Sequence, residues 1–281
     1  MPIPPETTLA DIDWNLLWQN ARKQKSWSSK GPADWDRKAD SFASRNMSSP
    51  YVSLFLERLP LASDLTVLDV GSGPGTLSIP LAGLVRSVTA VDYSAGMLDA
   101  LSRKAEEKDI HNIRTIQGAW EDDWLQLGIG VHDIAIASRS LAVANLSLAL
   151  QKLNDHARDY VFIADRISPT PFDPAAFAAI GREFQSGPDY IYTVGTLYAM
   201  GIHPCIDILK LDRDYVFRDI DEALDSYAWM FTDLSSREKE ALTGYVRSKV
   251  IHAKGGQVTL RREHPPRWAL IWWKKDRPLE K

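Results

Sequence analysis

The sequence predicts an α/β fold in which a doubly wound, mostly parallel sheet lies between layers of helices. Between residues 65 and 166, short apolar stretches alternate with helical stretches of about ten to fifteen residues, a pattern typical of βαβ units. The first apolar stretch runs straight into three glycines at alternate positions, Gly71, Gly73 and Gly75. Asp92 ends the second stretch about twenty residues beyond the first glycine, where a nucleotide-binding sheet often carries an acid.

Composition favours a protein that acts on small molecules. The 281 residues are 44% hydrophobic, enough for a substantial core, and no apolar run approaches the roughly 20 residues of a membrane helix. The N-terminus lacks the pattern of a signal peptide, so a cytoplasmic location is expected. The only cysteine, Cys205, excludes an intramolecular disulfide and a multi-cysteine zinc site, and no metal is expected. A net charge of −4 with scattered basic residues argues against a nucleic-acid partner.

Residues 1–60 are expected to form an N-terminal helical cap that is rich in tryptophan. Trp35, Ala39 and Phe42 recur at i, i+4 and i+7, which places them on one helix face. This face either packs on the core or closes over a bound cofactor, and Trp35 and Phe42 are candidates for the second role. After Pro50, a further helix is expected to run to Pro60.

Residues 61–166 are expected to form the ligand-binding core. Helices are predicted over residues 76–85 and 95–108, the second of them capped by Ser94. The apolar stretches predict five strands, at residues 67–70, 88–91, 112–117, 133–137 and 160–164. Ligands of such sheets lie beyond the carboxyl ends of the strands, so Ser138, Arg139 and Asp165 are expected to line one crevice.

The spacing of the glycine turn separates it from two common nucleotide motifs. A dinucleotide fingerprint needs its third glycine one residue later than Gly75, and small residues where Leu77 and Ser78 stand. A P-loop is excluded because no Gly-Lys-Ser/Thr follows the turn. Asp69, two residues before the turn, suits a cationic ligand group better than a pyrophosphate.

Three segments carry a resemblance to a known family. VLDVGSGPG at 67–75, AVDYSAGML at 90–98 and IQGAWED at 116–122 resemble, in order and spacing, the class I S-adenosylmethionine-dependent methyltransferases, in particular the broad group that acts on small molecules. The resemblance implies a Rossmann-like, seven-stranded sheet with an antiparallel C-terminal hairpin. It also implies S-adenosyl-L-methionine as cofactor, S-adenosyl-L-homocysteine as product, and in-line methyl transfer to a small-molecule acceptor, for which positioning and exclusion of water supply most of the catalysis.

The resemblance also implies roles for individual residues. The glycine turn would lie under the methionine and ribose, Asp92 would bind the ribose, and the fourth-strand end would face the transferred methyl group. Tyr93 and Met97 would flank the adenine, and Ala119 and Trp120 would cover its edge and face. The candidate cofactor residues are Asp69, Gly71, Ser72, Gly73, Gly75, Asp92, Tyr93, Met97, Ala119, Trp120 and Ser138, with Trp35 added from the cap.

Residues 167–256 are too long for a simple connection and are expected to form a substrate lid. Tyr198 and His203 are its candidates for acceptor binding or catalysis, since a histidine can act as a base near neutral pH. Arg139, at the end of the fourth strand, is a third catalytic candidate. Two helices of this segment are expected to begin at capping residues, one at Asp219 and one at the capping box of Ser235 and Glu238.

Residues 257–281 are expected to complete the core sheet. Two apolar stretches, 257–264 and 267–275, flank Pro265-Pro266 and resemble the antiparallel hairpin of the sixth and seventh strands of the family. The sequence is also compatible with a homodimer.

Other functions are less favoured. The fourth strand is not followed by Asn/Asp-Pro-Pro-Tyr/Phe, which disfavours methylation of bases or glutamine, and Pro204-Cys205 lies too late for a cytosine methyltransferase. Tyr245 and Lys249 match the Tyr-x-x-x-Lys of short-chain dehydrogenases, which keeps an NAD(P)-dependent oxidoreductase as an alternative. A non-catalytic S-adenosylmethionine-binding or regulatory protein needs the same glycines and Asp92, so the sequence leaves it open.

Overall fold

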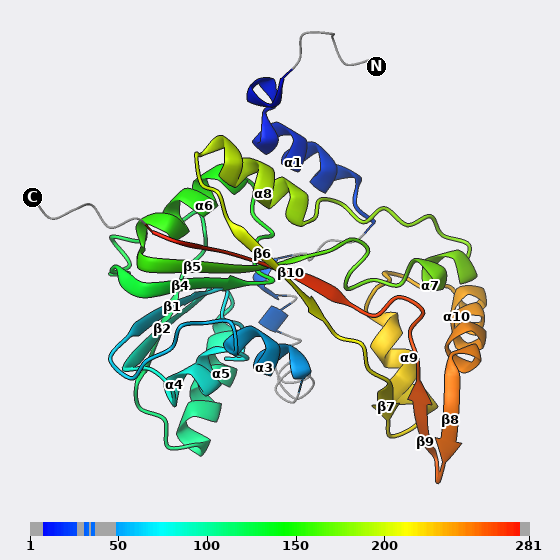
Figure 1. Ribbon diagram of the computed structural model, residues 1–281. Coiled ribbons are helices and arrows are strands. Elements are labelled where there is room, and N and C mark those ends of the chain that lie inside the picture. The colour runs from blue at the N-terminus through cyan, green and yellow to red at the C-terminus, as the bar shows by residue number, and fades with distance from the viewer. Residues whose placement is uncertain (1–7, 27–30, 34, 37–48, 276–281) are drawn as a thin grey trace, which may run out of the picture.

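A seven-stranded sheet forms the centre of the computed structural model, which describes residues 8–26, 31–33, 35–36 and 49–275 (Figure 1). The strands follow the order β3-β2-β1-β4-β5-β10-β6. Strands β1 to β5 run parallel, and β10 is antiparallel to both β5 and β6. The bounds are β1 Thr66–Val70, β2 Ser87–Asp92, β3 Ile113–Gln117, β4 His132–Ser138, β5 Ala157–Arg166, β6 Cys205–Lys210 and β10 Arg267–Lys274. The predicted fold class and its five parallel strands are confirmed.

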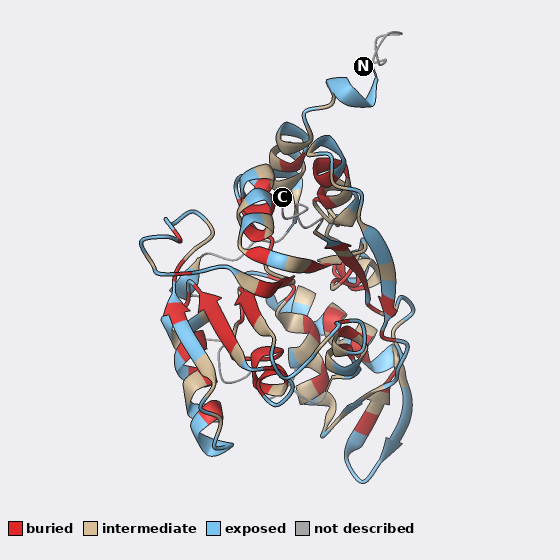
Figure 2. Cartoon of the chain, turned by 60° about the vertical axis from the view of Figure 1, so that its left-hand side comes forward, coloured by how far each residue is buried: buried red, intermediate tan, exposed pale blue. Residues whose placement is uncertain are grey.

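Both faces of the sheet are buried at its central strands β1, β4 and β5, which explains why these strands are mostly apolar (Figure 2). Neighbouring residues of β1, Val67 and Leu68, are each fully buried, one on each face. Helices α1 (Trp14–Gln24), α6 (Leu146–Asp155) and α8 (Tyr190–Ala199) cover the face of Leu68, whereas α3 (Pro50–Leu56) and α4 (Ser78–Ala82) cover the face of Val67. The 3-10 turn η1 (Leu9–Asp11) precedes α1.

The predicted helix caps are present. Ser94 Oγ accepts a hydrogen bond from Met97 N (3.2 Å) at the start of α5 (Ala95–Glu107), and Asp219 accepts from Glu222 N (2.8 Å) at the start of α9 (Ile220–Ala228). Ser235 and Glu238 form a reciprocal capping box at α10 (Ser236–Ser248). These contacts satisfy backbone N–H groups that a helix leaves unpaired at its N-terminus.

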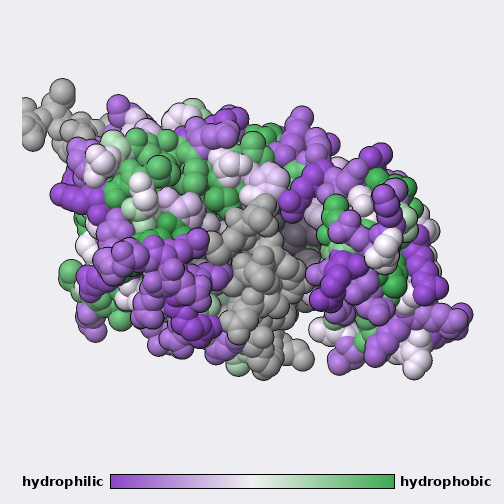
Figure 3. All heavy atoms as spheres, turned by 90° about the horizontal axis from the view of Figure 1, so that it is seen from below, coloured by the Kyte–Doolittle hydropathy of each residue, from purple (hydrophilic) through white to green (hydrophobic). Residues whose placement is uncertain are grey.

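A second, smaller sheet lies to one side of the first (Figure 1, right). It is antiparallel in the order β7-β9-β8, with bounds Tyr215–Phe217, Gln257–Leu260 and Val250–Lys254. Helices α7 (Pro174–Ala179), α9 and α10 pack around it on their own core, which includes Phe177, Tyr227 and Leu242. The surface of this part is mostly hydrophilic as seen in Figure 3, where it lies on the right.

The predicted C-terminal hairpin is wrong in its first strand. Residues 267–274 form β10 of the main sheet as expected, but 257–260 form β9 of the small sheet, and the sixth strand of the main sheet is β6, from within the predicted lid. A tight hairpin needs positive φ at both turn residues, which Gly255 (+61°) and Gly256 (+87°) adopt and proline cannot. Strand β9 therefore pairs with β8 across these glycines. The predicted division of the chain into an N-terminal cap, a core, a lid and a C-terminal segment stays a prediction.

Some sequence expectations fall outside this description. Ala39 and Phe42 of the N-terminal cap lie outside the described residues. Within the described ranges, no helix has the length and apolar character needed to cross a membrane.

Helix α1 is fixed against α8 and against the loop that follows β4. The ring of Trp14 covers Gly195 of α8 so closely that a Cβ there would lie 2.4 Å from it. Trp18 Nε1 donates to Val143 O (2.9 Å), and Asn15 Oδ1 accepts from Leu146 N (2.8 Å). Trp14 thus fixes α1 against α8, and Trp18 and Asn15 fix it next to the loop after β4.

We expect Gly195→Ala to lower the free energy of unfolding by about 1–3 kcal/mol, because the new methyl group displaces the Trp14 ring. Gly244, inside α10, is a matched control because no described atom lies within 4 Å of a Cβ at that position. Gly244→Ala should instead raise the free energy of unfolding by about 0.5–1 kcal/mol. Denaturant titration followed by circular dichroism checks both values, and equal effects of the two substitutions would contradict the proposed contact.

Candidate functional site

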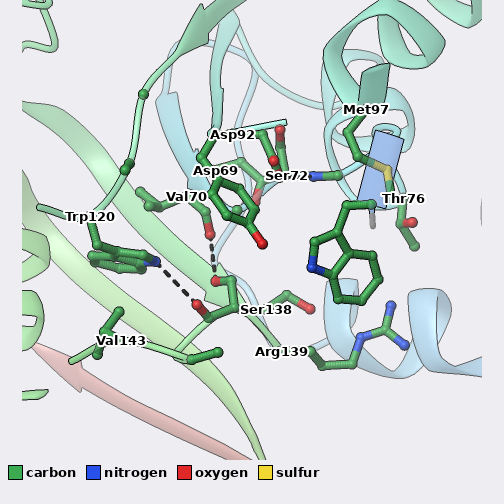
Figure 4. Close-up of a pocket in the computed structure, with 18 of the residues that line it drawn as sticks. Asp69, Val70, Ser72, Thr76, Asp92, Met97, Trp120, Ser138, Arg139 and Val143 are labelled. Atoms are coloured by element: carbon green, nitrogen blue, oxygen red, sulfur yellow. Dashed lines mark hydrogen bonds between the residues drawn. The ribbon is translucent and has the colours of Figure 1, made fainter. Parts of the chain in front are cut away.

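A cavity of about 210 Å³ opens at the carboxyl ends of β1, β2, β3 and β4 (Figure 4). Its wall comes from four loops and from the N-terminal segment. The lining residues are Trp35, Asp69, Val70, Gly71, Ser72, Gly73, Thr76, Leu77, Asp92, Tyr93, Met97, Gly118, Ala119, Trp120, Glu121, Ser138, Arg139, Ser140, Ala142 and Val143.

The three glycines of the turn after β1 serve different purposes. All have positive φ, and a Cβ on Gly71 would lie 2.2 Å from Ser140 Cβ, so this position allows the loop after β4 to approach. A Cβ on Gly75 would lie 2.9 Å from the side chains of Ile79 and Leu101, so this position allows α4 and α5 to pack. Gly73 has no described atom within 4 Å of its missing Cβ and lines the cavity. Its exposed backbone is where a ligand can lie against the chain.

Asp92 connects the glycine turn to the end of β2. One carboxylate oxygen accepts a hydrogen bond from Gly73 N (2.8 Å), and the other accepts from Ser94 N (2.9 Å). Burial raises the pKa of Asp92, and these bonds partly oppose that shift. Because each carboxylate oxygen can accept more than one hydrogen bond, Asp92 keeps capacity for a ligand hydroxyl on its cavity side.

Asp69 lies at the bottom of the cavity with 1% of its surface exposed. Its carboxylate accepts a short hydrogen bond from Ser78 Oγ (2.6 Å) at the start of α4. Burial raises the pKa of Asp69 to about 7; the Ser78 bond lowers it and Asp92 raises it further. A cationic ligand group beside Asp69 would favour its charged form.

The loop after β3 forms an aromatic wall. Trp120 Nε1 donates to Ser140 O (3.1 Å), which joins this loop to the one after β4. Lys152 Nζ donates to Trp120 O (2.7 Å), and Trp124 Nε1 donates to Ala119 O (3.0 Å). Ala119 and Trp120 are therefore held in place before any ligand binds.

The end of β4 carries a polar pair and a cation. Ser138 Oγ and Tyr51 OH are 2.6 Å apart. Arg139 has a positive φ of 60°, its N donates to Ala164 O (2.8 Å), and its guanidinium lies 4.4 Å from the centroid of the Tyr51 ring and 5.5 Å from that of Trp268. Stacking on two rings fixes this charge at the cavity wall.

The N-terminal segment closes one side of the cavity. Trp35 lines it and packs against Met97 and Ala100 of α5. Asp36 Oδ1 accepts hydrogen bonds from Ser94 Oγ (2.5 Å) and from Gly96 N (3.1 Å). Asp36 has no signal in the local sequence, because its partners lie 58 and 60 positions away along the chain.

Two buried hydroxyls in the cavity wall lack partners. Ser72 Oγ and Thr76 Oγ1 make no hydrogen bond within the part of the chain that the structure describes. A buried hydroxyl without a partner costs free energy, so each of these two groups is available to a ligand or a water molecule. The sequence carried no signal for Thr76, which lies one residue beyond the glycine motif.

Comparisons with known proteins agree with this geometry. A family model described as a methyltransferase domain matches residues 67–160, the part of the chain that supplies most of the cavity wall. An uncharacterized protein from Haemophilus influenzae is 31% identical over 273 residues, which cover 96% of this chain and 99% of that protein. Residues 67–160 therefore belong to this methyltransferase-domain family.

Solved structures show that this methyltransferase shares its fold with distant relatives. The YcgJ protein from Bacillus subtilis has a TM-score of 0.54 at 15% identity, covering 81% of this chain and 98% of that one. A putative methyltransferase from Bacillus halodurans has a TM-score of 0.55 at 14% identity, covering 80% of this chain and 99% of that one.

A further relative by sequence matches only part of the chain. Protein-L-isoaspartate O-methyltransferase from Photorhabdus laumondii is 31% identical over 86 residues, which cover 30% of this chain and only 41% of that protein.

The methyltransferase cavity contains most of the predicted site residues. All predicted cofactor residues except Gly75 line it, and so does Arg139. Tyr198 and His203 lie elsewhere, at the end of α8 and just after it, with their rings 5.6 Å apart and Tyr198 52% exposed. The tyrosines and the histidine of this stretch predicted an acceptor-binding role, but α8 directs the side chain of Tyr198 toward solvent.

The dehydrogenase-like pair of the sequence has a structural role in this methyltransferase. Tyr245 OH donates to Asp173 Oδ2 (2.8 Å) in the small-sheet part. Burial, together with that bond to Asp173, raises the pKa of Tyr245, the opposite of what proton transfer by a tyrosine requires. Lys249 Nζ lies 5.1 Å from the centroid of the Tyr245 ring and pairs with Glu263 (3.3 Å), and neither Tyr245 nor Lys249 lines the cavity.

We expect Asp69→Asn to change how the stability of the protein depends on pH. Because the pKa of Asp69 rises from 3.8 to about 7 on folding, the native state holds this proton more tightly than the unfolded chain. The contribution of the protonated Asp69 to the free energy of unfolding is complete below pH 4 and is lost as the pH rises through 7. The free energy of unfolding of the wild type, relative to Asp69→Asn, should therefore fall by up to about 1.4 kcal/mol per pH unit in this range. Urea titrations at several pH values measure it, and a constant difference would contradict the raised pKa.

Proposed function

We propose that this methyltransferase binds S-adenosyl-L-methionine in the cavity, transfers its methyl group to a small-molecule acceptor and releases S-adenosyl-L-homocysteine. The observation that carries the proposal is the placement of two carboxylates, those of Asp69 and Asp92, in the same cavity as the open backbone of Gly73. Ser72 and Thr76 line the same cavity, and their hydroxyls have no hydrogen-bond partner among the described residues, while Asp92 keeps free acceptor capacity. A cytoplasmic location and a homodimer remain predictions from the sequence.

The acceptor and apolar groups of the cavity wall fit the parts of such a cofactor. Asp92 would accept hydrogen bonds from the ribose hydroxyls, and Asp69 would face the cationic amino group of the methionine part. Trp120, Met97 and Trp35 supply apolar and aromatic surface for the adenine. When bound, the cofactor supplies a methyl group that its positive sulfur has already activated.

The residues of the chain then contribute by positioning and by excluding water. Leu77 and Val143 are apolar parts of the cavity wall, and Ser138 and Arg139 present polar groups at the end of β4. Burial raises the pKa of Tyr51, and Ser138 shares its hydrogen bond, so this pair orients groups and does not remove protons at neutral pH. An acceptor placed at the end of β4 is thus held and shielded there.

Turnover separates an enzyme from a protein that only binds the cofactor. The experiment incubates the protein with S-adenosylmethionine and a panel of small carboxylic acids, phenols and amines, and measures S-adenosylhomocysteine. Tight binding by calorimetry without product from any acceptor would favour a non-catalytic role. Absence of binding would overturn the proposal.

We expect Asp92→Ala to weaken binding of S-adenosylhomocysteine by about 1.5–3 kcal/mol, because charged hydrogen bonds to the ribose are lost. Asp133 is a matched control, since it is also a buried aspartate and binds Thr66 N (2.8 Å) at the other end of the sheet. Asp133→Ala should lower stability and leave the affinity unchanged. Isothermal titration calorimetry measures both, and equal losses would argue against a ribose contact.

Thr76→Val tests the unpartnered hydroxyl. The substitution keeps the shape of the side chain, so the free energy of unfolding should stay constant or rise, while the affinity for S-adenosylhomocysteine should fall by about 1 kcal/mol. Thr170→Val is the converse control, because Thr170 Oγ1 accepts from Arg267 N (2.8 Å) and its loss should reduce stability alone. Thermal unfolding and calorimetry distinguish the two patterns. A loss of stability in Thr76→Val would mean that the hydroxyl serves the fold.

A further inference from the structure

A second polar feature lies beside the cavity, at the carboxyl end of β5. Lys25 follows α1, and Arg166 is the last residue of β5. Both approach Gly187, since a Cβ there would lie 2.7 Å from Lys25 Cβ and 2.9 Å from Arg166 Nη2. Two cationic side chains from distant parts of the sequence thus lie side by side.

One loop holds both cations in place. Ser26 N donates to Gln185 O (2.9 Å), and Gln185 N donates to Ser26 Oγ (2.7 Å), which fixes the backbone next to Lys25. Arg166 Nε donates to Pro188 O (2.6 Å) a few residues further along the same loop. The approach of the two charges is therefore built into the backbone and does not depend on a flexible surface side chain.

The charge of Lys25 is not balanced by an acid within the part of the chain that the structure describes. Arg166 has Asp165 and Asp189 nearby, whereas burial lowers the pKa of Lys25 to about 8 and the charges of Arg22 and Arg166 lower it further. Asp165 already accepts hydrogen bonds from Thr193 Oγ1 (2.7 Å) and Arg166 N (2.8 Å). Holding like charges together in this way costs free energy that a bound anion would offset.

The cluster lies within reach of the cavity. Arg139, in the cavity wall, donates its backbone N–H to Ala164 O of β5. Arg166 is two residues beyond Ala164 on β5, which places it roughly 7 Å from Ala164. Arg22 Nη2 donates to Ala142 O (3.1 Å), which also belongs to the cavity wall. A small molecule bound at the end of β4 would therefore need to extend only past Ala164 to meet the cations at the end of β5.

We propose that Lys25 and Arg166 form a subsite for an oxyanion, a carboxylate or phosphoryl group, carried by the methyl acceptor. The acceptor role rests on the proposed function, whereas anion binding by these two side chains can be measured without turnover. A guanidinium and an ammonium group together provide several donors to one oxyanion. Arg166 would orient the group and Lys25 would neutralise it.

The experiment titrates the protein with benzoate, phenyl phosphate and neutral benzamide and follows ligand binding by NMR. We expect benzoate or phenyl phosphate, but not benzamide, to bind the wild type, and the preferred anion identifies the chemical class. Lys25→Gln should weaken that binding at least about tenfold, and Lys25→Arg should restore most of it. Lys23→Gln is the matched control, because Lys23 lies two residues earlier on the exposed side of α1.

Each outcome bears on the subsite separately from the cofactor. Equal binding by the wild type and Lys25→Gln, equal binding of benzoate and benzamide, or no binding of either anion would overturn the subsite. Calorimetry with S-adenosylhomocysteine on the same samples reports the cofactor site, and its affinity should be the same in Lys25→Gln as in the wild type. If the wild type itself does not bind S-adenosylhomocysteine, the proposed function fails and the test of the subsite is unaffected.

Discussion

The carboxylate of Asp92 is the interaction on which the site depends. It joins the turn after β1 to the start of α5 by accepting from Gly73 N and Ser94 N at once. Without these two bonds, a turn of three glycines with positive φ would lose its preferred shape, because glycine restricts the backbone least of all residues. The same carboxylate borders the cavity, so one buried acid both shapes the turn and presents acceptors to a ligand.

Around this centre, short-range contacts position residues from distant parts of the chain. Ser140 Oγ donates to Val70 O (2.7 Å) while its backbone carbonyl accepts from Trp120, so the loops after β1, β3 and β4 meet at one residue. Lys152 of α6 then supports the aromatic loop from behind. The cavity wall is therefore held together by hydrogen bonds on the side of the glycine turn, and Trp35 contributes to its other side.

Sequence reasoning reached the parts of the fold that local patterns encode. Buried parallel strands are apolar runs, and glycines with an acid at the next strand end mark the turn, so β1 to β5 and most of the cavity wall could be predicted. Strand β6 could not, because its partner β10 lies far along the chain and its Ile206 and Ile208 are 41% exposed, which weakens the apolar signal. Tyr51 and Asp36 also escaped notice, since their partners lie 87 and 58 residues away. The direction of Tyr198 on α8 was equally unreadable from its neighbours in sequence.

The bond between Asp36 and Ser94 has a thermodynamic consequence. It docks the segment that carries Trp35 onto the first turn of α5, so docking of this segment and filling of the cavity involve the same residues. Two processes that share contacts in this way are linked, and the linkage is reciprocal. If docking of Trp35 and Asp36 strengthens ligand binding by some free energy, then ligand binding stabilises the docked state by the same free energy. The N-terminal region is then a component of the binding equilibrium, and a chain shortened at that end would be a different receptor with an unchanged sheet.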